Sequence, residues 1–166
     1  MEIKYQTALK NNPVITVTTG DIADGGSYSF SLEPLTLGGI IKLEAIYNSG
    51  HQFPASLREL LFLAGKACYV LDYGLYDTQE EMQDDIREVL VERGVTILTR
   101  PFFVIDVRSG PSIFLFVYLD EGVNDPVIYE ANPHTTVSDP LLSLQASLST
   151  FVNARIDYLL RGVSPY

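Results

Sequence analysis

The chain contains few side chains that could act as nucleophiles or bases. Its 166 residues include one cysteine, Cys68, and two histidines, His51 and His134. A nucleophilic cysteine needs a lowered thiol pKa and a neighbouring base, whereas Cys68 lies in the apolar run 67–71, which favours a buried, protonated thiol. Both histidines lie in predicted loops beside proline or polar residues. We therefore expect no catalytic pair among these residues and no enzymatic activity.

Carboxylates are the abundant reactive groups. Two of them could act as a pair in glycoside hydrolysis if burial kept one protonated, but those of the helix predicted from Thr78 are expected to be exposed, where a carboxyl pKa stays ordinary. Asp120, Glu121 and Asp125 could bind calcium, yet their spacing lacks the alternating ligands and central glycine of an EF-hand, which favours a plain turn. A carboxylate-dependent hydrolase stays open as a minor alternative. The sequence predicts no cofactor and no metal.

The acidity of the chain is concentrated in one segment. Eleven Lys and Arg residues stand against 21 Asp and Glu residues, giving a net charge of −10. Eight of these acids but only one base, Arg87, lie between Asp72 and Glu92, so this segment carries most of the net charge. Because such a surface repels phosphate backbones, the composition disfavours nucleic acid as a partner.

An amphipathic helix is predicted within the acidic segment. Thr78 and Glu81 have the spacing of a capping box, in which the threonine hydroxyl accepts from the N3 amide and the glutamate reaches back to the cap. Gly94 is expected to end the helix. Acids at every fourth position line a face away from the apolar stripe: Glu80, Asp84, Glu88 and Glu92.

Two interpretations of this acidic face stay open. A charged column opposite an apolar stripe is typical of any solvated surface helix. Like charges, however, repel by about 0.2–0.5 kcal/mol per i,i+4 pair, and tyrosines, which are common in protein interfaces, precede the helix at Tyr69, Tyr73 and Tyr76. We predict that Glu80, Asp84 and Glu88 are solvent-exposed. The candidate protein-binding residues are seven of the eight acids of this segment and two of the tyrosines: Asp72, Tyr73, Tyr76, Asp77, Glu80, Glu81, Asp84, Asp85 and Glu88.

The remaining pattern predicts helices packed on an antiparallel sheet. Two β-branched or alternating runs near the N-terminus should pair as strands, at residues 14–19 and 27–32. Runs 101–107 and 113–119 are apolar on both faces, so we expect neighbouring antiparallel strands in the middle of a covered sheet. Further strands are predicted at 69–71 and 127–129, and helices at 35–47, 54–65 and from Pro140, capped by Asp139, to Gly162.

The helix predicted at residues 54–65 carries a resemblance to a known family. It begins at Pro54 and ends at Gly65, within Gln-Phe-Pro-Ala-Ser-Leu-Arg-Glu-Leu-Leu-Phe-Leu-Ala-Gly. A preceding helix, a hydrophobic-Pro pair and a helix of the type slREfllxxG resemble the opening of the SUKH superfamily, which includes Knr-type regulators of yeast glucan synthesis and bacterial toxin-immunity proteins. The step from Asp125 to Pro126 before a strand is similar to the sheet of that family. The resemblance covers about residues 35–160.

We therefore expect a single α+β domain, with a β-rich N-terminal extension at residues 1–34, a SUKH-like region at 35–166 and a long C-terminal helix. The resemblance implies a protein-binding domain, acting as an immunity protein that masks a toxin, possibly a basic nuclease. The alternative is a regulatory or scaffolding protein of the same type without a toxin partner. One cysteine forms no internal disulfide, and neither a secretory signal nor a membrane-spanning run is found, so we expect a cytoplasmic protein.

Overall fold

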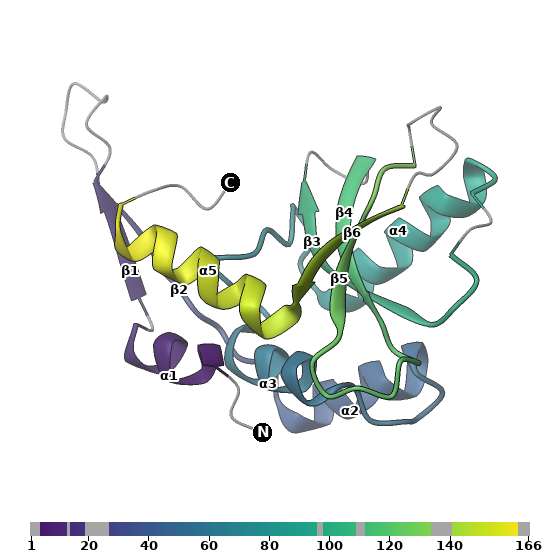
Figure 1. Ribbon diagram of the computed structural model, residues 1–166, viewed down its shortest axis with the longest axis horizontal. Coiled ribbons are helices and arrows are strands. Elements are labelled where there is room, and N and C mark those ends of the chain that lie inside the picture. The colour runs from purple at the N-terminus through teal and green to yellow at the C-terminus, as the bar shows by residue number, and fades with distance from the viewer. Residues whose placement is uncertain are drawn as a thin grey trace.

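The two long apolar runs form neighbouring strands in the computed structural model of the chain, as predicted (Figure 1). β3 (Phe102–Arg108) pairs with β4 (Ile113–Tyr118), and β5 (Val127–Ala131) and β6 (Leu141–Ser147) complete an antiparallel sheet of order β3-β4-β5-β6. The structure describes residues 4–12, 14–18, 27–95, 98–108, 112–133 and 141–162.

Each face of this sheet is covered by helices, which explains why β3 and β4 are apolar on both sides. One face packs on α2 (Leu37–Tyr47), α3 (Ala55–Ala64) and α5 (Leu148–Leu160), and α1 (Lys4–Asn11) joins the same core by packing on α3 and α5. The other face packs on α4 (Gln79–Glu92). In Figure 1, α4 and α5 accordingly lie on opposite sides of the sheet. The chain is thus a single α+β domain with a C-terminal helix.

The position of β3 within the sheet differs from the prediction, because β3 is an edge strand and not a central one. Its outer edge is nevertheless covered. The side chain of Gln83 in α4 donates to the carbonyl of Val104 at 2.8 Å and accepts from its amide at 2.9 Å, as a neighbouring strand would. The amide of Val107 donates to the carbonyl of Asp72 at 2.7 Å. A side chain and a loop therefore replace a fifth strand.

The predicted helices α2, α3 and α4 are confirmed, with local reasons for their ends. Thr36 caps α2 by accepting a hydrogen bond from the amide of Gly39 at 3.1 Å. Gly65 follows the last residue of α3, and a Cβ there would lie 2.4 Å from the carbonyl oxygen of Leu61 and 2.8 Å from the side chain of Leu35. Only a residue without a side chain lets Leu35, just before α2, lie so close to the end of α3.

The N-terminal region contains the predicted strand pair and a helix that the sequence analysis missed. β1 (Val14–Thr18) pairs in antiparallel fashion with β2 (Ser27–Ser31), as expected. The missed helix is α1, whose Tyr5 and Leu9 are fully buried against the core of the later helices. The strand predicted at residues 69–71 does not form; this stretch is irregular backbone that leads into the acidic segment.

The C-terminal helix is shorter than predicted. Residues 141–147 form β6, which pairs with β5, and α5 begins only at Leu148. Its N-cap is Ser147, whose hydroxyl accepts from the amide of Thr150, and not Asp139, which lies outside the described residues together with Pro140. The spacing of leucines continues from the strand into the helix, so that the apolar pattern alone did not mark the boundary.

Candidate protein-binding site

The predicted acidic helix forms, and its cap has nearly the expected geometry. Thr78 accepts a hydrogen bond from the amide of Glu81 at 3.1 Å, and Glu81 reaches back to the amide of Asp77 at 2.9 Å, one residue before the position expected of a capping box. Met82, Ile86 and the buried Gln83 face the sheet. This orientation turns the acidic residues of α4 away from the core.

The one base of the segment, Arg87, is turned inward. Its guanidinium donates to the carbonyls of Gln83 at 2.8 Å and Phe102 at 2.7 Å, and lies 4.5 Å from the ring centre of Tyr47 and 4.4 Å from that of Phe102. Burial lowers the pKa of Arg87, while Tyr47 and Asp84 oppose this shift. The exposed charged side chains of α4 are therefore all acids, namely Glu81, Asp84, Glu88 and Glu92, and they lie beside the exposed apolar side chain of Val91.

The prediction that Glu80 is solvent-exposed holds only in part. Glu80 is half-buried on the side of α4 that faces α2, where its carboxylate pairs with Lys42 at 2.6 Å. Asp84 and Glu88 are exposed, as predicted. Asp84 also accepts a hydrogen bond from the hydroxyl of Tyr47 at 2.7 Å, and burial together with this bond raises the pKa of Tyr47. Asp84 thus joins α4 to α2 as well as facing solvent.

The predicted tyrosines have structural partners. Tyr73 and Tyr76 are half-buried, and their hydroxyls donate to the carbonyl of Ala64 at 3.0 Å and to the carboxylate of Asp85, respectively. Burial and the hydrogen bond to Asp85 raise the pKa of Tyr76. Tyr69 is buried and donates to the carbonyl of Asn12, so it lies beneath the surface that it was expected to flank.

The loop between these tyrosines exposes a large apolar side chain. Leu75 is entirely solvent-exposed, directly between Tyr73-Gly74 and Tyr76. The turn is closed by Asp72, whose carboxylate accepts from the amide of Gly74 at 2.7 Å, and Gly74 has the positive φ of 66° that glycine tolerates. The nine candidate residues therefore lie on two consecutive elements, the loop 72–78 and α4.

A buried ion pair that the sequence analysis missed holds the start of this loop. Asp106 of β3 and Arg155 of α5 form a salt bridge with side-chain exposures of 0% and 4%. The same arginine donates to the carbonyl of Val70 at 2.7 Å, and the other oxygen of Asp106 accepts from the amide of Asp72 at 3.4 Å. Burial raises the pKa of Asp106, and the guanidinium of Arg155 opposes this shift. An aspartate within an otherwise apolar strand was the available signal.

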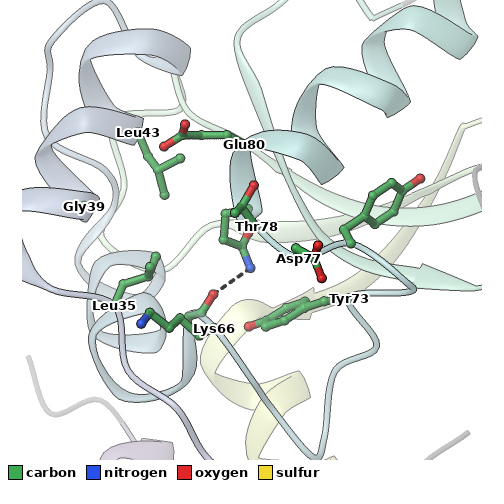
Figure 2. Close-up of a pocket in the computed structure, with 11 residues that line it drawn as sticks. Leu35, Gly39, Leu43, Lys66, Tyr73, Asp77, Thr78 and Glu80 are labelled. Carbon is green, nitrogen blue, oxygen red and sulfur yellow. Dashed lines mark hydrogen bonds between the residues drawn. The ribbon is translucent and has the colours of Figure 1, made fainter.

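A cleft adjoins the acidic face where α4 begins. It has a volume of about 330 Å³ and lies between α2, the end of α3 and the loop 72–78 (Figure 2). Leu35 and Leu43 supply apolar wall, and Tyr73, Asp77 and Glu80 line the side towards α4. Gln79, whose side chain donates to the carbonyl of Gly65 at 3.0 Å, joins the two sides at the base of the helix.

The residues considered for catalysis and metal binding occupy ordinary positions. Burial raises the pKa of Cys68 to about 11, so its thiol is protonated at neutral pH. His51 is exposed in a loop, and His134 lies outside the described residues. Asp120 pairs with Arg100, and Asp125 accepts from the amide of Ser149 at 2.9 Å. Within the described ranges, no three His, Cys, Asp or Glu side chains are grouped to hold a metal ion.

Comparison with known proteins adds no identification. No protein-family model matches the chain, and neither a curated protein nor a solved structure is similar enough to count as a match. The resemblance to the SUKH superfamily therefore stays a prediction. In the part of the chain that the structure describes, no helix combines the length and apolar character needed to span a membrane.

Proposed function

We propose that this protein binds a basic protein partner through the outward face of α4 and the preceding loop 72–78. The observation that carries the proposal is the inward position of Arg87, which leaves Glu81, Glu88 and Glu92 on an exposed face without a neutralising cation of their own helix. Repulsion among such charges costs free energy that alternating charges would avoid, so a folded chain gains little from this arrangement by itself.

The chemistry of this surface favours association with a positively charged protein. Clustered charges of one sign raise the rate of encounter with an oppositely charged partner and disfavour partners of the same sign. The exposed Leu75 beside the acids adds an apolar contact, and the hydrogen-bonded Tyr73 and Tyr76 keep the loop that carries it in place. An apolar contact within a charged rim is a typical interface composition.

The biological role that we propose is that of a cytoplasmic immunity protein. The resemblance to the SUKH superfamily implies this role, and the acidic surface supports a basic toxin, such as a nuclease, as the target. A nuclease cleft must attract phosphate and is therefore basic, so an acidic protein seated on it would both steer towards the cleft and exclude the substrate.

The test uses the polypeptide encoded beside this gene as the partner and measures association rates at several salt concentrations. We expect the rate for the wild-type protein to fall steeply with salt, and Glu88→Lys to lower it severalfold at low salt. Asp157→Lys is the matched control, because Asp157 is equally an exposed acid on a helix but lies on α5 across the sheet. Equal effects of the two variants, or a rate independent of salt, would contradict the proposed surface.

A further inference from the structure

The cleft beside α4 has the size and walls of a site for one inserted side chain. Its volume of about 330 Å³ is at the small end of the range for ligand pockets, roughly 300–1,000 Å³. Leu35 and Leu43 face it from the α2 side, and Gly39 leaves room between them because no side chain projects there. An elongated apolar group of a partner would therefore find a partly enclosed, apolar lining.

The polar groups of the cleft favour a cation on the side towards α4. Asp77 and Glu80 both line the side towards α4, and Glu80 is already paired with Lys42. Asp77 is exposed, and its carboxylate is bound to no lysine or arginine of the described ranges. Tyr73 and Asp77 both line the cleft, as does Lys66, whose side chain extends towards Leu35 in Figure 2.

We infer that this cleft receives an arginine side chain of the basic partner, an inference that rests on the proposed function and specifies its contact. The aliphatic stem would lie against Leu35 and Leu43, and the guanidinium would meet the carboxylate of Asp77 beside the ring of Tyr73. Arginine fits better than lysine because a planar guanidinium both stacks on an aromatic ring and pairs with a carboxylate, whereas an ammonium is a compact, strongly hydrated charge.

The protein uses the same combination of groups within its own fold. The guanidinium of Arg100 lies 3.9 Å from the ring centre of Tyr118 and 2.6 Å from a carboxylate oxygen of Asp120. In the cleft, Tyr73 and Asp77 offer two groups of the same kinds, an aromatic ring and a carboxylate. An arginine of the partner would add the third group.

The experiment titrates the ¹⁵N-labelled protein with the peptide Ac-Gly-Arg-Gly-NH₂ and follows amide chemical shifts, with citrulline and lysine peptides for comparison. We expect the arginine peptide to shift the amides of Gly39, Gly65 and Asp77, the lysine peptide to bind severalfold more weakly, and the citrulline peptide, which lacks the charge, to cause no such shifts.

Two neighbouring glycines provide a matched pair of variants. Gly39→Met fills the cleft, and its Cβ would lie 3.4 Å from the hydroxyl of Thr36 and 3.7 Å from the side chain of Leu35, which the helix accommodates. Gly38→Met places the same side chain on the exposed surface of α2, where the nearest atom, the hydroxyl of Thr36, is 4.0 Å away. We expect Gly39→Met to lower the affinity for the arginine peptide at least tenfold, and Gly38→Met to leave this affinity unchanged.

The outcomes separate this inference from the proposed function. The arginine site is overturned if Gly38→Met and Gly39→Met bind the arginine peptide with equal affinity. It is also overturned if the wild-type protein binds the arginine and lysine peptides with equal affinity. Shifts confined to the outward face of α4 around Glu88 also overturn it, yet they leave the acidic binding surface intact. If the peptides shift neither region, both the cleft and the acidic surface are contradicted as sites for basic groups.

Discussion

Asp106 shows how one buried side chain positions a surface loop. It lies after a bulge in β3, where Val104 pairs with Phe116 and Asp106 with Leu115, so that the extra Ile105 shifts the register. Ile105 packs with the α5 side of the core, and Asp106 also meets Arg155 of α5. From there the pair binds the backbone of residues 70 and 72, where the candidate binding loop begins.

Removing one partner of this pair should be costly. We expect Asp106→Asn to lower the free energy of unfolding by about 3–5 kcal/mol, because it leaves the charge of Arg155 buried and unbalanced. Urea denaturation monitored by circular dichroism measures this change. Asp120→Asn serves as the control: Asp120 also pairs with an arginine, but its side chain is 41% exposed, so we expect a loss of no more than about 1 kcal/mol. Comparable losses for the two variants would mean that Asp106 does not anchor the fold.

For individual residues of the site, the sequence predicted exposure on the helix but not the contacts with α2. Helical spacing placed Asp84 and Glu88 on the exposed face, and this prediction is confirmed. The same spacing could not show that Lys42 and Tyr47, both of α2, would meet Glu80 and Asp84, because these contacts depend on how two helices distant in sequence pack. For the same reason, the sequence could not predict that the side chain of Arg87 points inward.

At the scale of helices and strands, the sequence predicted the elements correctly where caps, glycines or apolar runs were pronounced. The cap at Thr78 and the glycine at position 65 located α4 and α3, and continuous apolar runs located β3 and β4. The leucine spacing of residues 141–148 is compatible with a helix, but pairing with β5 makes most of this stretch a strand, so tertiary contacts overrode the helical pattern. α1 was missed although Tyr5 and Leu9 have the i,i+4 spacing of a buried helical face.

The attachment of α1 should depend on pH. Tyr69 donates its hydroxyl to the carbonyl of Asn12, just after α1, at 2.7 Å, and burial raises the pKa of Tyr69 to about 12. An unfolded tyrosine ionises near pH 10, so the contribution of Tyr69 to stability is fully present below about pH 10 and is lost as the pH rises through about 12.

Urea denaturation between about pH 8 and about pH 12 measures this dependence. Tyr69→Phe cannot ionise at this position, so its stability should start lower but fall less steeply with pH than that of the wild-type protein. Parallel curves for the two proteins would show that Tyr69 titrates alike in the folded and unfolded chains.

At the scale of the whole molecule, α4 and α5 lie on opposite faces of the sheet, while α4 also meets α2 through the contacts of Glu80 and Asp84. α5 belongs to the core that also includes α1, α2 and α3, whereas α4 is the described helix that covers the other face and carries acids outward (Figure 1). The α+β class was predictable from the apolar runs and the capped helices. The cleft was not, because it forms where α2, α3 and the loop 72–78 meet, a junction that no local pattern describes.

The central claim, that the outward face of α4 binds a basic protein, is tested most directly by carboxyl footprinting. Exposed acids are coupled to glycine ethyl ester with a carbodiimide in the free protein and in its complex with the polypeptide encoded beside its gene, and labelling is quantified by mass spectrometry. We predict that labelling of Glu88 and Glu92 on α4 falls on complex formation, while that of the exposed Asp157 on α5 is unchanged. Unchanged labelling of Glu88 and Glu92, or protection of Asp157 in their place, would contradict the claim.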